Sequence, residues 1–88
     1  MSDQGGASRE QILAKVREHL ATELELDPAE IVEGASFRDD LDADSLDLYE
    51  LVMELEDTYG VSMSEEEAAA ITRVGDAVGF VHERLGRG

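Results

Sequence analysis

The chain has 88 residues, enough for one small domain, and 42% of them are hydrophobic. It has no cysteine, so the sequence excludes disulfides, thiol catalysis and thiolate metal sites. Seven basic residues against 22 acidic residues give a formal net charge of −15, which disfavours a nucleic-acid partner, because phosphate contacts need cations, and favours a basic protein partner.

The first residues predict a flexible lead followed by a helix. Residues 1–7 contain two glycines and show no signal-peptide pattern, and no apolar run is long enough to span a bilayer. We therefore expect a cytoplasmic location and no membrane partner. Ser8 and Gln11 fit a capping box. Apolar residues then recur at three- and four-residue spacing over a helix of about 9–24: Ile12, Leu13, Val16, Leu20 and Leu24.

A long first loop, roughly residues 25–44, follows this helix. Asp27 and Pro28 predict a single helical turn, because an aspartate cap and a proline at the first position both favour a helix start. Gly34 then breaks the chain. In the stretch "SFRDDL" we expect Phe37 and Leu41 to fill part of the core.

The second helix is predicted over residues 45–59, with Gly60 as its left-handed terminal residue. At about 100° per residue, one stripe forms the expected core face: Leu48, Leu51, Val52, Leu55 and Tyr59. Leu46 and Met53 lie almost opposite that stripe, with Tyr49 at the flank. The long first loop could cover Leu46, but a second apolar strip opposite a complete core stripe favours a docking surface for a partner.

Acidic residues surround this second strip. Glu50 and Asp57 share its face, and Asp47 and Glu54 lie at its edge. Residues 39–72 hold 12 acids and no Lys or Arg, so like-charge neighbours on the helix each cost about 0.2–0.5 kcal/mol with no lysine to offset them. A cost of this kind indicates that the pattern serves a basic partner.

Two shorter patterns complete the chain. Ser64 and Glu67 fit a capping box for a short helix in "SEEEAAAI", and the last helix carries one apolar stripe: Val74, Val78, Val81 and Leu85. Gly75 and Gly79 are expected to weaken that helix by about 1 kcal/mol each. No credible strand remains. The predicted fold is therefore all-α, a small four-helix bundle of three longer helices and one short one over residues 8–85, with flexible residues 86–88.

Ser45 has two interpretations. Asp44 or Ser45 at a helix start is most often simply a cap. A nucleophilic serine needs a nearby base, and the only histidines, His19 and His82, lie in the first and last predicted helices. We therefore expect no catalytic residue in this chain. If Ser45 takes part in chemistry, another protein must supply the catalytic machinery.

The same stretch also matches part of a calcium-binding loop. Asp40, Asp42 and Asp44 occupy ligand positions one, three and five of an EF-hand loop. Ser45 then stands where glycine belongs, and Leu51 stands where a bidentate glutamate belongs, so no metal site is predicted. An acidic helical calcium-binding or adaptor module is the alternative from a different class.

The stretch "DADSLDLYELVMELEDTYGVSMSEEEAAAITRVGDAVGFV" resembles the acyl carrier proteins, and the similarity extends from about Arg9 to Leu85. The resemblance implies that Ser45, in the motif Asp44-Ser45-Leu46, carries a 4′-phosphopantetheine cofactor installed from coenzyme A by a phosphopantetheinyl transferase. The thiol of this arm would hold acyl groups as thioesters for acyl-transferring and ketosynthase-type enzymes. The "ELVMELE" run favours fatty acid synthesis, and a polyketide or other specialised pathway is the alternative.

By the same resemblance, acidic residues would face basic patches on these enzymes: Asp44, Asp47, Glu50, Glu56 and Asp57. Leu46, Tyr49 and Met53 would make the apolar contacts between them. The sequence departs from the family pattern where Asp42 replaces the usual glycine, where Met63-Ser64 replaces the usual Ile-Pro, and in the glycines of the last helix. We expect a monomeric carrier that is not itself an enzyme.

Overall fold

The computed structural model describes residues 8–87 and contains four α-helices. They are α1 (Arg9–Leu24), α2 (Ser45–Tyr59), α3 (Glu65–Ala69) and α4 (Val74–Arg87), with one 3-10 turn, η1 (Pro28–Glu30), after α1. No strand occurs within the described range, so the predicted all-α four-helix bundle is confirmed. α4 continues two residues past its predicted end. The predicted lead, residues 1–7, lies outside the described residues.

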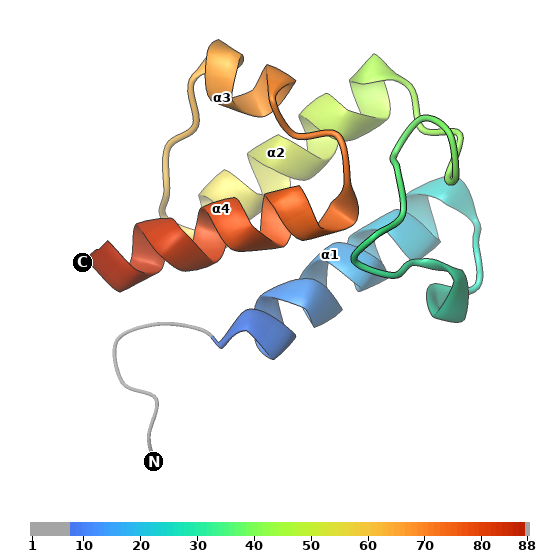
Figure 1. The fold of residues 1–88 in the computed structure, drawn as a ribbon, viewed down its shortest axis with the longest axis horizontal. Helices are drawn as coiled ribbons and strands as arrows, with labels where there is room; N and C mark the ends of the chain where they lie inside the picture. Colours follow the sequence, from blue (N-terminus) through green and yellow to red (C-terminus); the bar gives the residue numbers. More distant parts are fainter. Residues whose placement is uncertain (1–7, 88) are drawn as a thin grey trace.

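The three long helices pack against one another, and α3 lies to one side of α2 and α4 (Figure 1). α1 runs in one direction, and α2 and α4 both return in the other. The first loop carries the chain from the end of α1 to the start of α2. In the part of the chain that is described, no helix combines the length and the apolar character that a membrane crossing requires.

Side-chain caps set where the helices begin. The side chains of three residues each accept a hydrogen bond from the backbone N–H three positions later: Ser8, Asp44 and Ser64. In each case the side chain of the later residue accepts a hydrogen bond from the backbone N–H of the cap residue. These capping boxes satisfy N–H groups that have no partner inside the helix. Gly60 ends α2 in the left-handed conformation, as predicted, with a φ of 68°.

The core contains only apolar side chains among the described residues. The predicted stripe on α2 is confirmed, since Leu51, Val52 and Leu55 are buried and Leu48 and Tyr59 pack partly buried against them. The first loop contributes as well, because its predicted core residues are both buried: Phe37 and Leu41. The remaining buried positions come from α1, α4 and the loops around them: Ile12, Val16, Leu20, Ile31, Ala35, Ala43, Ile71, Val74, Ala77, Val78 and Val81.

Backbone hydrogen bonds tie the first loop to the start of α4. The N–H of Phe37 donates to the carbonyl of Thr72 at 3.0 Å, and the N–H of Gly75 donates to the carbonyl of Glu33 at 2.8 Å. A Cβ at position 75 would lie 3.1 Å from the Glu33 carbonyl oxygen, which is closer than side chains normally come. Gly75, expected from the sequence only to weaken the helix, therefore permits this contact. The contact holds the loop that leads to Ser45.

Candidate functional site

Ser45 is the first residue of α2, and its side chain is exposed. Asp44 caps the helix, because its carboxylate accepts the N–H of Asp47 at 3.0 Å while the Asp47 carboxylate accepts the N–H of Asp44 at 3.1 Å. The capping role therefore belongs to Asp44, and the Ser45 hydroxyl is not consumed by it. Instead, the Ser45 Oγ accepts a hydrogen bond from the guanidinium of Arg38 at 3.2 Å.

The loop in front of Ser45 is held firmly. Asp42 has a φ of 57°, in the left-handed region that glycine adopts without strain and that aspartate tolerates better than most residues. The glycine usual at this position in the resembling family would suit the same backbone. Leu41 and Ala43, on either side of Asp42, are buried. Ser45 thus projects from a helix end whose approach is packed into the core.

The electrostatics around Ser45 do not favour autonomous catalysis. Hydrogen bonds from the backbone N–H of Asp47 hold the pKa of Asp44 below its usual value, and the Arg38 charge adds to the effect. A carboxylate with a lowered pKa is a weak proton acceptor. No described histidine hydrogen-bonds Ser45, and Arg38 can only donate. The hydroxyl is therefore accessible but has no base beside it.

A groove of about 760 Å³ opens beside Ser45, between α2 and α3. Arg38 and Thr72 are among its polar lining residues, together with Ser45 itself. Its apolar lining comes from the first loop, α2, α3 and the segments that flank α3: Phe37, Leu48, Tyr49, Val52, Met53, Met63, Ala68, Ala69 and Ile71. Asp39, Glu56 and Glu65 also line the groove, so it combines apolar surface with polar and charged groups, as a site for a small molecule can.

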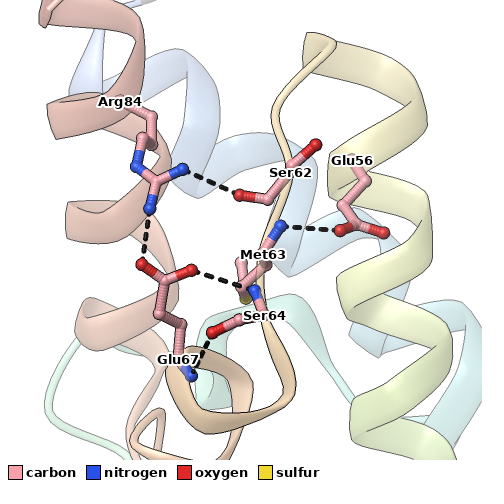
Figure 2. A network of polar contacts seen from close by, with 6 residues as sticks. All are labelled: Glu56, Ser62, Met63, Ser64, Glu67 and Arg84. Atoms are coloured by element: carbon pink, nitrogen blue, oxygen red, sulfur yellow. Dashed lines mark hydrogen bonds and ion pairs between the residues drawn. The ribbon is translucent and has the colours of Figure 1, made fainter.

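A network of polar contacts anchors the segment that leads into α3, one wall of this groove (Figure 2). Arg84 of α4 donates to the carbonyl of Ser62 at 2.9 Å and forms an ion pair with Glu67. From the other side, the Glu56 carboxylate of α2 accepts the backbone N–H of Met63 at 2.8 Å. Both α2 and α4 therefore hold the start of α3.

This network holds the start of α3 at the position where Met63-Ser64 replaces the usual Ile-Pro. The N–H of Ser64 donates to Glu67 at 2.9 Å, and the N–H of Glu67 donates back to the Ser64 hydroxyl at 3.1 Å. The backbone hydrogen bond at Ser64 and the nearby Arg84 charge lower the pKa of Glu67. The guanidinium of Arg84 also lies 4.5 Å from the centre of the Phe80 ring, which helps to hold it in place.

Three apolar side chains of α2 point into solvent, and they are the ones predicted to form the second strip. Leu46 is 61% exposed, Tyr49 is 62% exposed and Met53 is 51% exposed. Their phase on the helix was therefore predicted correctly. We call these three residues the apolar strip. Large apolar groups exposed together on one helix are typical of an interaction surface.

The acids around the apolar strip differ in how they are already engaged. Glu54 forms an ion pair with Lys15 of α1 at 3.1 Å, so the expectation that no lysine offsets these acids was wrong. Hydrogen bonding to Lys15 and its charge lower the pKa of Glu54. Glu56 accepts a backbone N–H beyond the end of α2, and Asp47 closes the α2 cap. Asp57 is exposed and makes no hydrogen bond or ion pair with the described residues.

Glu50 lies in a cluster of like charges. Carboxylate oxygens of Glu23, Asp47 and Glu50 lie within 4.8 Å of one another, and no other described group of acids or histidines is gathered as closely. The Glu23 carboxyl raises the pKa of Glu50, through hydrogen bonding and charge repulsion. Two of the three aspartates of the calcium-loop match make other contacts, because Asp40 accepts a backbone N–H within its own loop and Asp44 caps α2.

Three basic residues that matter at this site were not identified from the sequence: Lys15, Arg38 and Arg84. Arg38 could have been identified from the sequence, because it is the only basic residue in the stretch just before Ser45. Nothing in the sequence points to Lys15 and Arg84, because their partners lie 39 and 17 residues away along the chain. Pairing over such separations depends on how the helices pack and cannot be inferred from spacing.

Known proteins are similar to this chain in sequence and in fold. Residues 14–81 match the family described as phosphopantetheine attachment site. The acyl carrier protein of Rubrobacter xylanophilus is 52% identical over 75 residues, which cover 85% of this chain and 93% of that protein. A solved acyl carrier protein from Enterococcus faecalis aligns with a TM-score of 0.77 at 33% identity, over 89% of this chain and 99% of that one.

A second solved acyl carrier protein, from Thermotoga maritima, aligns with a TM-score of 0.78 at 29% identity, over 90% of this chain and 92% of that one. The matched family segment includes the exposed serine at the start of α2 and the groove beside it. The chain belongs to the acyl carrier protein family, whose members carry phosphopantetheine and act as carriers rather than catalysts.

Proposed function

We propose that Ser45 is the attachment point of the 4′-phosphopantetheine arm and that the chain presents acyl intermediates of fatty acid synthesis to separate enzymes. The observation that supports this most directly is the position of Ser45, an exposed hydroxyl at the start of a rigid helix, on the edge of an apolar groove. When bound, the arm supplies a thiol that holds the acyl group as a thioester.

The residues around Ser45 fit a phosphodiester. The attached phosphate would be an anion next to the first N–H groups of α2, where the helix dipole stabilises negative charge. Asp42 and Asp44 would offset part of this benefit, because they are acids in the same short segment. Among the described residues, only Arg38 hydrogen-bonds the hydroxyl, and it cannot take up a proton. A phosphopantetheinyl transferase would therefore remove the proton while the Ser45 oxygen bonds to the phosphate and the nucleotide part of coenzyme A leaves.

The groove between α2 and α3 suits the apolar part of the cargo. Leu48 and Val52 line it from α2, and Ala68 and Ala69 line it from α3. Small alanine side chains leave room between the two helices, and burying methylene groups of an acyl chain there contributes about 0.8 kcal/mol per group. We propose that this groove covers the acyl chain between encounters with enzymes.

The face of α2 would dock those enzymes. The apolar strip supplies contact area, and the acids beside it attract basic surfaces over a longer range. The partners we propose are the phosphopantetheinyl transferase and acyl-transferring and ketosynthase-type enzymes with basic patches. A cytoplasmic, monomeric carrier fits these partners. Among the acids, Asp57 is the most available, because neither a cap nor an ion pair engages it.

The attachment site can be tested by mass spectrometry. The apo protein is incubated with coenzyme A, Mg²⁺ and a broad-specificity transferase, and we expect one phosphopantetheine to be added to the wild type and none to Ser45→Ala. Ser62→Ala is a matched control, because Ser62 is exposed and contacts Arg84 only through its backbone carbonyl. Addition to Ser45→Ala, or no addition to the wild type, would show the proposal to be wrong.

The pathway needs a separate test. The intact mass of the protein purified from its native cells reports the cargo directly. A series of acyl masses separated by two-carbon saturated units supports fatty acid synthesis. Masses of chains that retain oxygen at every second carbon would instead indicate a polyketide pathway.

A further inference from the structure

We propose that Arg38 is a phosphate-binding residue that holds the phosphodiester of the arm and so fixes where the arm leaves the protein. This inference rests on the proposed attachment at Ser45. Arg38 lies seven residues before Ser45 in the first loop, and its guanidinium already donates to the Ser45 Oγ at 3.2 Å. Both residues line the groove between α2 and α3.

The other described cations of the chain are already engaged. Three of them form ion pairs with carboxylates: Arg9, Lys15 and Arg84. Two more donate to backbone carbonyls: Arg17 and Arg73. Arg38 differs from all five. Its one hydrogen bond to a described residue goes to Ser45, and no described carboxylate oxygen lies within 4.0 Å of its nitrogens.

An unpaired guanidinium is unexpected in this neighbourhood. The chain has 22 acids, and Asp39, Asp40, Asp42 and Asp44 lie within six residues of Arg38, yet none forms an ion pair with it. The guanidinium points instead at a neutral hydroxyl. That arrangement leaves its charge available for an anion that forms at the hydroxyl oxygen.

Attachment of the arm would create that anion. The Ser45 Oγ becomes an ester oxygen, and a negative charge spreads over the two non-bridging oxygens of the phosphate one bond away. A guanidinium that reaches the Oγ also reaches those oxygens with a small rotation, and its planar fork suits two phosphate oxygens at once. Arg38 would then be a positioning residue, which directs the arm along the edge of the groove that it lines.

The alternative is that Arg38 acts only on the start of α2, whether or not Ser45 is modified, by balancing the charge of Asp44. The two roles differ in one measurable respect. A purely structural Arg38 stabilises the apo and holo proteins equally. A phosphate-binding Arg38 stabilises the holo protein more than the apo protein.

The test compares melting temperatures of the apo and holo forms of the wild type, Arg38→Gln, Arg38→Lys and Arg9→Gln. Mass spectrometry first verifies that each variant carries the arm. We expect the holo-minus-apo difference to be lower in Arg38→Gln than in the wild type by between about 1 and 8 °C at low salt, the range for an exposed ion pair in a domain of this size. Arg38→Lys should recover part of the difference. Arg9→Gln, which removes an equal charge that pairs with Glu33, should match the wild type.

Phosphorus NMR of the holo proteins gives a second readout. The phosphodiester resonance should move in Arg38→Gln and stay in place in Arg9→Gln. If Arg38→Gln lowers the apo and holo melting temperatures equally and leaves the resonance unchanged, the inference is wrong although the attachment site stands. If the wild type takes up no arm, the proposed function itself is wrong.

Discussion

Two residues of α2 test at the residue scale whether the apolar strip is separate from the core. Leu55 is fully buried and Met53 is half exposed, although they are only two positions apart. We expect Leu55→Ala to lower the free energy of unfolding by about 2–5 kcal/mol, because it leaves a cavity among packed side chains. Met53→Ala should change it by about 0.5 kcal/mol or less, as surface substitutions usually do.

Urea denaturation followed by circular dichroism measures both values. Leu51→Ala, at another fully buried position of the same stripe, provides the matched control and should behave like Leu55→Ala. Equal losses for Met53→Ala and Leu55→Ala would mean that the apolar strip belongs to the core.

Glu50 should make the stability of the protein depend on pH. The Glu23 carboxyl raises the pKa of Glu50, so the folded protein favours the protonated form of Glu50. A group of this kind adds stability below its unfolded pKa, and that stability is lost as the pH rises through the folded pKa. Glu50→Gln should therefore raise the melting temperature at pH 7, and the gain should fade as the pH is lowered into the range where Glu50 itself takes up a proton.

A double-mutant cycle isolates the responsible pair. Glu23→Gln should give a similar gain at pH 7, and the double variant should gain little beyond either single one, because one substitution already removes the repulsion. Strictly additive gains would show that general charge relief, rather than this pair, is responsible. The pH dependence of the wild type alone cannot replace these variants. The pKa values of Asp44, Glu67 and Asp76 are lowered in the folded protein, so these groups make the wild type less stable as the pH falls, which is opposite to the effect of Glu50.

At this scale, the sequence predicted what depends on local spacing. The caps at Ser8 and Ser64 and the burial of Leu51 and Leu55 follow from residues three or four positions apart, which are neighbours on any helix. The ion pair between Lys15 and Glu54 could not be predicted in this way. It exists because α1 packs beside α2, and many packings are compatible with the same two helices.

At the scale of elements, α3 depends on its neighbours. A helix of five residues is unstable in isolation, because the nucleation cost is not recovered over so few hydrogen bonds. Arg84 supplies one of its anchors through Ser62 and Glu67 (Figure 2). We expect Arg84→Ala to speed hydrogen exchange of the α3 amides severalfold, while the amides of α1 keep their protection.

Arg9→Ala is the control for this measurement. It removes a comparable ion pair, with Glu33, that does not involve α3, so α3 exchange should stay at the wild-type rate. An unchanged α3 in Arg84→Ala would show that the capping box and the apolar contacts of the helix suffice to hold it.

In α4 the sequence predicted the helix and its core face, but not the role of Gly75. The stripe of Val74, Val78 and Val81 predicted its core face correctly, since all three are fully buried. Its two glycines were counted only as weak helix formers. The close approach of Glu33 to Gly75 is a contact between segments more than 40 residues apart, and helix propensity contains no information about it.

In the proposed docking of the whole molecule to its partners, net charge and the apolar strip have separate roles. A net charge of −15 on a small bundle gives a long-range field that would attract basic surfaces, and in the proposed mode of docking the apolar strip makes contact only after encounter. The hypothesis can be drawn from the sequence because it depends on composition and on the phase of one helix. The sequence could not predict which acids remain available, because Lys15 and the backbone of the α3 segment occupy two of them.

The availability of Asp57 makes it a suitable site for testing how the phosphopantetheinyl transferase binds. Asp57→Lys is the cleanest charge reversal, since Asp57 is exposed and a change at Glu54 would also break its ion pair with Lys15. We expect Asp57→Lys to slow association severalfold at low salt, and the loss should shrink as salt screens the field. Met53→Ala should instead speed dissociation by about five- to tenfold, with little dependence on salt, because it removes buried contact.

Surface plasmon resonance at several salt concentrations separates the two rates, and circular dichroism melts show that both variants stay folded. Glu30→Lys is a useful control, because it makes the same charge change on the exposed turn η1, which packs against α1 and does not line the groove next to the apolar strip. If Glu30→Lys slows association as much as Asp57→Lys, the net charge of the molecule rather than the face of α2 guides encounter. If Met53→Ala leaves dissociation unchanged, the transferase does not dock on the apolar strip.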